Sequence, residues 1–387
     1  MIEQLLAARE IVVVCGSGGV GKTTTAAALG ALAADRLDGR VLVLTVDPAR
    51  RLATALGLEA LGNVETRIPT AAFEQAGYSP RGELWVAMLD TKQSWDDLVR
   101  RHAPDAETRD AILANPLYAN ITGRFVQSHD YIAMERLYEI HISGRYDLVI
   151  VDTPPSRNAI DLLDAPDRMA DFFSSRFLRW LIAPYRSRVV TFASRPFMQL
   201  ADRVLGSQFL QQIADFFVLF QSMYDGFVER AKAVEAVLHD RRTTFVVVST
   251  LEAAPVRETE FFLAELAKRK LPLGAVILNK VLPDALRSAK GGALARSLAT
   301  PAGAAAAAAK LPVSLAGDPL TATVLGEIGE SYVRMAVAAV READAQALLA
   351  SRCGLVATVP NLSSDISDLA GILAVGDLLS RRDDAQR

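Results

Sequence analysis

The chain has few cysteines and no strong excess of charge of either sign. Of its 387 residues only Cys15 and Cys353 are cysteine, and no C-x-x-C pair is present, so no disulfide framework is indicated. The net charge of −3 gives no broad attraction to nucleic acid. No uncharged apolar run of 18 residues suggests a membrane span, and the first residues lack the basic start and cleavage site of a signal peptide. These absences predict a cytoplasmic protein.

A glycine-rich loop is the most informative motif that is present. Residues 16–24 read Gly-Ser-Gly-Gly-Val-Gly-Lys-Thr-Thr and contain the spacing G-x-x-x-x-G-K-T of a P-loop. An apolar, β-branched run precedes the loop and an alanine-rich helical sequence follows it, as a phosphate site at a helix N-terminus requires. In such a loop Lys22 reaches the β- and γ-phosphates and the Thr23 hydroxyl ligates Mg²⁺. The residues predicted to bind nucleotide here are Gly18, Gly19, Val20, Gly21, Lys22, Thr23 and Thr24.

Apolar runs alternate with helical segments along most of the chain. This alternation predicts an α/β fold with a doubly wound, mostly parallel sheet, in which ligands bind at the carboxyl ends of the strands. We expect a single P-loop domain over residues 1–387, with helical inserts at about 94–142 and 165–240. The expected strands are 11–14, 41–46, 147–151, 244–249, 275–278 and 354–359.

Two aspartates follow expected strands and suit phosphate chemistry. Asp47 precedes Pro48 after the second run and can orient or deprotonate an attacking water; a helix N-cap is the alternative, and both roles can coexist. Asp152 ends the apolar run Leu148–Val151 in a Walker B arrangement, where it would hold Mg²⁺. The predicted switch loop, which senses the γ-phosphate, comprises Asp152, Thr153, Pro154, Pro155 and Ser156.

Two further residues are candidates for the base of the nucleotide. Asn279 ends the fifth run, and its amide offers both a donor and an acceptor to the edge of adenine, although a plain turn asparagine is the alternative. Pro360 follows the last run and is placed to wall the base.

The insert at 165–240 is rich in aromatic and arginine residues. It holds 13 of the 26 aromatic side chains of the chain, which either form the core of a helical subdomain or line a groove. A groove rimmed by arginine would receive a hydrophobic helix or face a membrane surface, so a peripheral membrane location is compatible with this segment. The region 285–350 is alanine-rich and predicted to be helical.

With these residues in view, the chain resembles the arsenite-pump and guided-entry ATPase family, whose P-loop is of the deviant type. The resemblance rests on residues 16–24, 45–51 and 152–158 together with Asn279 and Pro360. Within the family, the chain resembles the actinobacterial ArsA-like proteins that occur as paralogous pairs. It implies a Mg·ATP-dependent dimer that opens and closes with nucleotide state. By position, Asp47 would orient water, Thr23 and Asp152 would serve Mg²⁺, and Asn279 would contact adenine.

Three departures from the family pattern shape the functional hypothesis. The cysteine trio of arsenite-activated members and the C-x-x-C of zinc-clamped members are both missing. Ser17 stands where members usually carry a signature lysine that crosses to the nucleotide of the partner subunit. Since a trans cation is worth roughly 10³–10⁵ in rate, the sequence predicts a heterodimer with a lysine-bearing paralogue, and a homodimer is the alternative.

Three functions are compatible with these sequence features. The first is an ATPase whose nucleotide-driven switching is coupled to a hydrophobic client helix or a membrane protein. The second is the ATPase subunit of an anion transporter, and the third is a nucleotide-bound regulatory scaffold with low turnover. DNA partitioning is disfavoured because the charge is slightly acidic and no basic stripe is present.

Overall fold

The computed structural model describes residues 1–46, 62–118, 126–154, 223–312 and 319–381, together with the isolated positions 52, 53, 56, 58, 164, 165, 168, 171, 216, 218 and 219. Most of the aromatic insert expected at 165–240 therefore lies outside the described residues.

An eight-stranded sheet forms the centre of the molecule, with strand order β3-β4-β2-β5-β1-β6-β7-β8. All neighbouring strands are parallel except β3 and β4 at one edge. The predicted α/β fold with a mostly parallel sheet is confirmed, and each of the six expected strands corresponds to an observed one. The strands are β1 Ile11–Gly16, β2 Arg40–Thr45, β3 Thr66–Arg67, β4 Glu83–Met88, β5 Leu148–Asp152, β6 Thr243–Ser249, β7 Leu273–Val281 and β8 Val356–Pro360.

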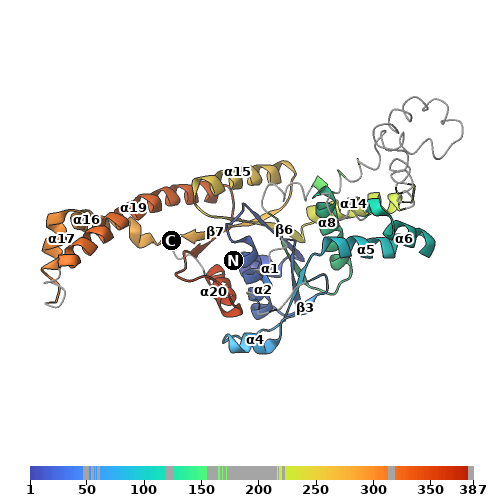
Figure 1. Ribbon diagram of the computed structural model, residues 1–387, viewed down its shortest axis with the longest axis horizontal. Coiled ribbons are helices and arrows are strands. Elements are labelled where there is room, and N and C mark those ends of the chain that lie inside the picture. Colours follow the sequence, from blue (N-terminus) through green and yellow to red (C-terminus); the bar gives the residue numbers. More distant parts are fainter. Residues whose placement is uncertain are drawn as a thin grey trace, which may run out of the picture.

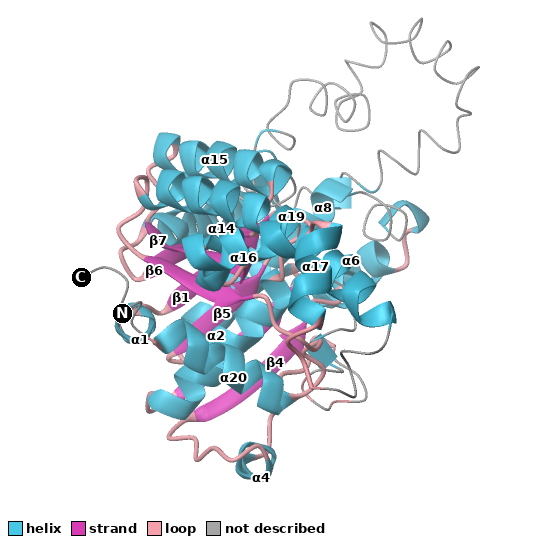
Figure 2. Cartoon of the chain, turned by 90° about the vertical axis from the view of Figure 1, so that its left-hand side faces the viewer, coloured by secondary structure: helices cyan, strands magenta, loops and turns pink. Residues whose placement is uncertain are grey.

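Helices cover both faces of the sheet, and Figure 2 shows the strands between the two layers. Among the described helices, none combines the length and apolar composition needed to cross a membrane. The helices are α1 Ile2–Ala7, α2 Lys22–Arg36, α4 Thr70–Gln75, α5 Thr91–His102, α6 Ala106–Leu113, α8 Val126–Ile142, α14 Tyr224–His239, α15 Ala253–Lys268, the 3₁₀ helix η1 Asp284–Arg287, α16 Ala289–Leu298, α17 Pro301–Ala308, α19 Pro319–Ala350 and α20 Leu369–Ser380.

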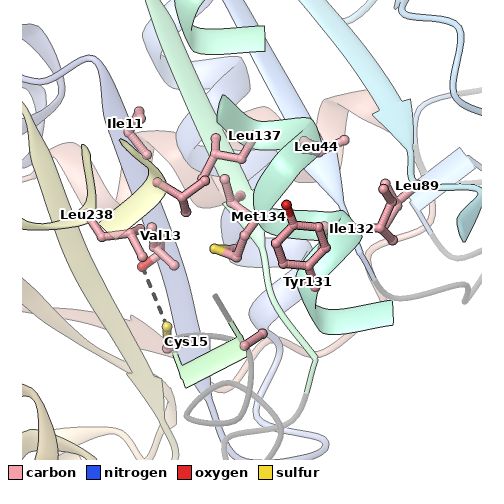
Figure 3. Packing of buried hydrophobic residues seen from close by; sticks show 14 of the residues in the cluster. Ile11, Val13, Cys15, Leu44, Leu89, Tyr131, Ile132, Met134, Leu137 and Leu238 are labelled. Carbon is pink, nitrogen blue, oxygen red and sulfur yellow. Dashed lines mark hydrogen bonds between the residues drawn. The ribbon is translucent and has the colours of Figure 1, made fainter. Parts of the chain in front are cut away.

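Strand β1 shows how the two faces are built. Its six residues are all buried, so it has no polar face, as expected for a central parallel strand. Alternate side chains enter separate cores: Val13 and Cys15 lie with α5, α8, α14 and α15, whereas Val12 and Val14 lie with α1, α2 and α20. In Figure 3, residues of α8 such as Tyr131 and Met134 pack toward β1.

The described aromatic side chains near the helical insert belong to the first of these cores. Trp95 of α5, Tyr131 of α8 and Phe227 of α14 form a cluster with ring centroids 5.7–6.1 Å apart. Phe216 is also buried in this core, at 3% exposure. Phe216 and Phe227 therefore belong to the main core that packs against the sheet, and neither lines a groove.

An arm of helices projects from one side of the body (Figure 1). It comprises α16, α17 and the N-terminal half of α19, a helix of 32 residues that spans about 48 Å. Ser288 and Thr300 cap α16 and α17 through their hydroxyls, and Pro301 occupies the first turn of α17. Close packing of α16 on α19 depends on Gly329, where a Cβ would lie 2.7 Å from the Ala295 carbonyl oxygen. The helical character of this region agrees with the prediction, whereas its projection was not foreseen.

Contact between α2 and the sheet depends on Gly30. A Cβ at this position would lie 2.3 Å from Cγ2 of Val43, which is fully buried in β2. We expect Gly30→Ala to lower the free energy of unfolding by about 1–2 kcal/mol, because overpacking outweighs the gain in helix propensity. Gly354→Ala is the matched control, since its Cβ would meet no atom within 4 Å. Equal urea midpoints for the two variants would contradict this account.

Candidate nucleotide-binding site

The glycines of the P-loop have the backbone conformations that such a loop requires. Gly19 and Gly21 have φ values of 79° and 94°, in the left-handed region that other residues adopt at a cost. Gly16 has a φ of 154°, and a Cβ there would lie 2.1 Å from the Val248 carbonyl oxygen of β6. The loop leaves β1 at Gly16 and enters α2 at Lys22, so the N-terminus of a 15-residue helix faces the loop.

Lys22 is the first residue of α2, and its side chain lies under the P-loop. Its side chain is 7% exposed, and Nζ donates a hydrogen bond to the Ser17 carbonyl oxygen over 2.9 Å. Gly18 and Gly19 are exposed, whereas Val20 is buried and Thr23 and Thr24 are half-buried. The Ser17 side chain is only 5% exposed, and its Oγ has no hydrogen-bond partner among the described residues. Position 17 therefore presents neither a cation nor an exposed side chain.

Asp152 lies beside the P-loop because β5 pairs with β1. Their parallel register aligns Asp152 with Val14, two residues before the loop. The carboxylate is fully buried, and Thr45 at the end of β2 donates to its Oδ2 over 2.9 Å. Thr153 anchors the next residue by donating from Oγ1 to the Val14 carbonyl oxygen over 2.8 Å.

Thr45 is a site residue to which the sequence reasoning gave no role. It ends β2, is 1% exposed and orients the Asp152 carboxylate. A hydroxyl residue ending one strand, next to the strand with a terminal aspartate, was the available signal. Of the other predicted site residues, Pro154 is half-buried after β5, whereas Asp47, Pro155 and Ser156 lie outside the described residues.

Asn279 contacts the P-loop directly. Its Nδ2 donates to the Val20 carbonyl oxygen over 2.8 Å, and its Oδ1 accepts from the Lys280 N–H over 2.9 Å. A Cβ on Gly21 would lie 2.3 Å from this Nδ2. The two bonds use one N–H of the amide and one acceptor site of its oxygen, so an adenine edge need not replace either of them. The contact of Asn279 with adenine stays a prediction.

Pro360 lies farther from the loop than Asn279. It is exposed at the end of β8 and is paired with Val281, and the next residue, Asn361, donates its N–H to the Val281 carbonyl oxygen over 2.9 Å. The structure thus brings Lys22, Asp152 and Asn279 to the P-loop and places Pro360 one strand beyond β7. Its predicted contact with the base also stays a prediction.

Cys15 lies beneath the site but has no reactive thiol. Burial raises the pKa of its thiol to about 12, and the hydrogen bond from Thr153 and the charge of Lys22 oppose this rise only in part. The thiol is therefore protonated at neutral pH, and a protonated thiol is neither a nucleophile nor a soft-metal ligand. This agrees with the absence of a cysteine trio from the sequence.

A second polar cluster joins α5, α8 and α14 away from the P-loop. Ligand atoms of His102, Glu135 and Glu139 lie within 4.8 Å of one another. Arginines already pair with both carboxylates, however: Arg230 lies 2.7 Å from Glu135, and Arg136 lies 3.2 Å from Glu139. Burial and the neighbouring arginines lower the pKa of His102 to about 4. The cluster is thus a network of ion pairs between helices, and three guanidinium groups, including that of Arg101, disfavour a metal cation.

Comparison with known proteins identifies the family. The model of the ArsA-type family described as "Anion-transporting ATPase" matches residues 9–292. The chain is 30% identical over 274 residues to an uncharacterized protein of Streptomyces coelicolor, with 70% of this chain and 62% of that protein covered. It is 28% identical over 277 residues to ATPase ASNA1 homolog 1 of Paramecium tetraurelia, with coverage of 70% and 74%. It is 25% identical over 277 residues to the ATPase ASNA1 homolog of Entamoeba dispar, with coverage of 70% and 76%.

The matched region contains the P-loop and strands β1, β2, β5, β6 and β7, whereas β8, which carries Pro360, lies beyond it. The chain spans less than two thirds of the length of the Streptomyces protein. The family match covers well over half of this chain and ends at residue 292, inside α16, so most of the arm lies beyond it. The chain belongs to the ArsA-type anion-transporting ATPase family, and ATP hydrolysis is the activity that this membership assigns to it.

Proposed function

We propose that the chain binds ATP with Mg²⁺ at the P-loop and couples hydrolysis to the opening and closing of a dimer. The observation that carries this proposal is the loop itself, with two exposed glycines before a 15-residue helix and Lys22 beneath. Backbone N–H groups of residues 18–24 would cradle the phosphates, and Lys22 would reach the β- and γ-phosphates. The favourable helix N-terminus adds to the attraction for anions.

The oxygen ligands near the loop fit a magnesium ion. Thr23 begins α2 with a half-buried hydroxyl, and Asp152 supplies a carboxylate that Thr45 holds in place. Hydroxyl and carboxylate oxygens are the hard ligands that Mg²⁺ prefers, and the ion would neutralise charge on the phosphates. We propose that Asp47 orients the attacking water and that residues 152–156 form the switch loop. Asn279 and Pro360 are the proposed contacts of the base.

Ser17 favours a heterodimer over a homodimer. Its side chain is short, buried and uncharged, so it cannot reach the nucleotide of a partner subunit. A paralogue with lysine at the matching position would supply a trans cation to this chain, which would then hold the one strong catalytic site. Coupling to a hydrophobic client helix or a membrane partner is the accompanying proposal, supported by the similarity to proteins named ATPase ASNA1. Ser17 equally favours a second candidate, a low-turnover scaffold, if the chain pairs only with itself.

Purification of the tagged chain from its native cells, followed by mass spectrometry, tests the heterodimer. We expect a stoichiometric P-loop paralogue that carries lysine at the position matching Ser17, and we expect ATP hydrolysis by the pair to exceed that of this chain alone by roughly 10³-fold or more. Ser17→Lys tests the same point in the isolated chain, with Ser17→Ala as the control that removes the hydroxyl without adding charge. Recovery of a homodimer without a paralogue, with hydrolysis restored by Ser17→Lys, would contradict the heterodimer.

A further inference from the structure

Exposed apolar side chains are concentrated on α19. Of the 15 large apolar residues that are exposed in the described part of the chain, seven belong to this helix, so they do not represent the usual scatter over a surface. They are Leu320, Val324, Ile328, Met335, Val337, Val340 and Leu348.

Three of these residues form one stripe, which we call the α19 stripe: Val324, Ile328 and Met335, exposed by 50%, 54% and 43%. At about 100° per residue, they fall within an arc of roughly 40°. Gly329, which contacts α16, lies roughly 120° away by the same rule. The stripe is therefore on a side of the helix that α16 does not cover.

The same face of α19 is covered where the helix passes over the body. Residues 328, 335, 342 and 349 follow at intervals of seven and so share one face. In this series Leu349 is fully buried, and the Glu342 carboxylate accepts the Leu282 N–H over 2.9 Å. Ile328 and Met335 continue the face beyond the body, where it is exposed. The helix thus continues this face past the domain that covers its other end, and the part beyond the domain is apolar.

Charges beside the stripe complement those of an identical antiparallel helix, and Arg334 also forms an exposed ion pair over 3.6 Å with Glu330 of its own helix. Glu327 and Arg334 each precede a stripe residue by one position and lie on the same flank, both exposed. If two copies of α19 pair antiparallel about a two-fold axis between residues 330 and 331, each Glu327 lies level with Arg334 of the other copy. The same axis places the partner's Met335 midway between Val324 and Ile328, so the apolar side chains interleave. An isologous contact of this kind requires one patch to complement itself, and this patch does.

We propose that α19 pairs in this antiparallel manner with α19 of a second copy of the chain. The contact uses the arm, most of which lies beyond the family match, and it is separate from the P-loop edge where nucleotide-dependent pairing is proposed. If the proposed heterodimer forms, α19 pairing joins two heterodimers through their arms.

Sedimentation velocity on the full-length chain without nucleotide tests the proposal. We expect a concentration-dependent dimer whose Kd rises more than 10-fold in Ile328→Glu or Val324→Glu. The matched control is Val340→Glu, which is equally exposed at 52% on the same helix but lies roughly 140° from the stripe. Circular dichroism checks that each variant keeps its helices, and Val324→Ala provides a milder change that places no charge in the contact.

A charge exchange identifies the occupant as a second copy. E327R and R334E alone should each weaken the dimer by about 10-fold, because each places like charges level with one another. The double variant E327R/R334E should return Kd to within about threefold of the original, since the two ion pairs form again with reversed sign. A chain that stays monomeric at all concentrations, a double variant that does not recover, or a Val340→Glu chain that dissociates as readily would each overturn the proposal. ATP hydrolysis should be unchanged in these variants, so this test is independent of the proposed function.

Discussion

Lys22→Ala is expected to reduce ATP hydrolysis by a factor on the order of 10³ while leaving the protein folded. The side chain is 7% exposed, and its ammonium group is held 2.9 Å from the Ser17 carbonyl oxygen, inside the loop that would hold the phosphates. Charge that develops on the γ-phosphate in the transition state would then lose its cis cation. No other residue of the loop carries a positive charge, because Ser17 replaces the lysine that resembling proteins carry.

Phosphate release should be measured with any lysine-bearing paralogue present, so that the trans cation is constant. Lys290→Ala, which removes an exposed lysine of α16, is the matched control and should leave the rate within twofold. The free energy of unfolding of the nucleotide-free chain should fall by only about 1 kcal/mol in Lys22→Ala, the value of one hydrogen bond. Hydrolysis by Lys22→Ala within threefold of the original would exclude this lysine as the cis cation.

Most of the strands that the sequence alone predicted are buried on both faces, and β8, in which buried and partly exposed residues alternate, is an exception. Runs such as Ile11–Val14 and Thr244–Ser249 are continuous and rich in β-branched residues because every side chain enters a core. This pattern is typical of a buried parallel strand. Strand β4, Glu83–Met88, was not predicted. It lies near the sheet edge, two of its residues are Glu83 and the half-buried Trp85, and its pattern lacks a continuous β-branched run.

The candidate site also contains features that the sequence predicted and features that it did not. Lys22 and Asp152 were predictable because each belongs to a motif in which chemistry fixes the spacing from a strand. The hydrogen bond between Asn279 and Val20 was not, since it joins residues 259 positions apart and depends on the order of β1, β6 and β7. The direction of the arm could not be predicted either. Helix propensity predicts the length of α19, but it does not predict the contacts that orient the helix, such as that between Gly329 and α16.

Gly21→Ala is expected to destabilise the P-loop strongly while leaving all charges in place. Its φ of 94° costs an alanine about 1–2 kcal/mol, and the new Cβ would lie 2.3 Å from Asn279 Nδ2. Asn279 would have to move and give up its bond to the Val20 carbonyl oxygen, at a further cost of about 1 kcal/mol. We therefore expect a loss of about 2–3 kcal/mol in the free energy of unfolding, measured in urea without nucleotide.

Gly19→Ala separates the two contributions to this loss. Gly19 has a similar φ of 79°, but its Cβ would meet no atom within 4 Å, so this variant should lose the conformational cost alone. Asn279→Ala removes the atoms with which the Gly21 Cβ collides. The double variant Gly21→Ala/Asn279→Ala should therefore lose less free energy of unfolding than the sum of the losses in the two single variants. That non-additivity, about 1 kcal/mol, is the coupling between the loop and β7. If Gly21→Ala and Gly19→Ala lose the same free energy and the double variant is additive, Asn279 does not support the loop. A base contact by Asn279 would then have no link to loop stability, whereas the hydrogen bond to Val20 predicts that one amide both supports the loop and keeps its second N–H for the base.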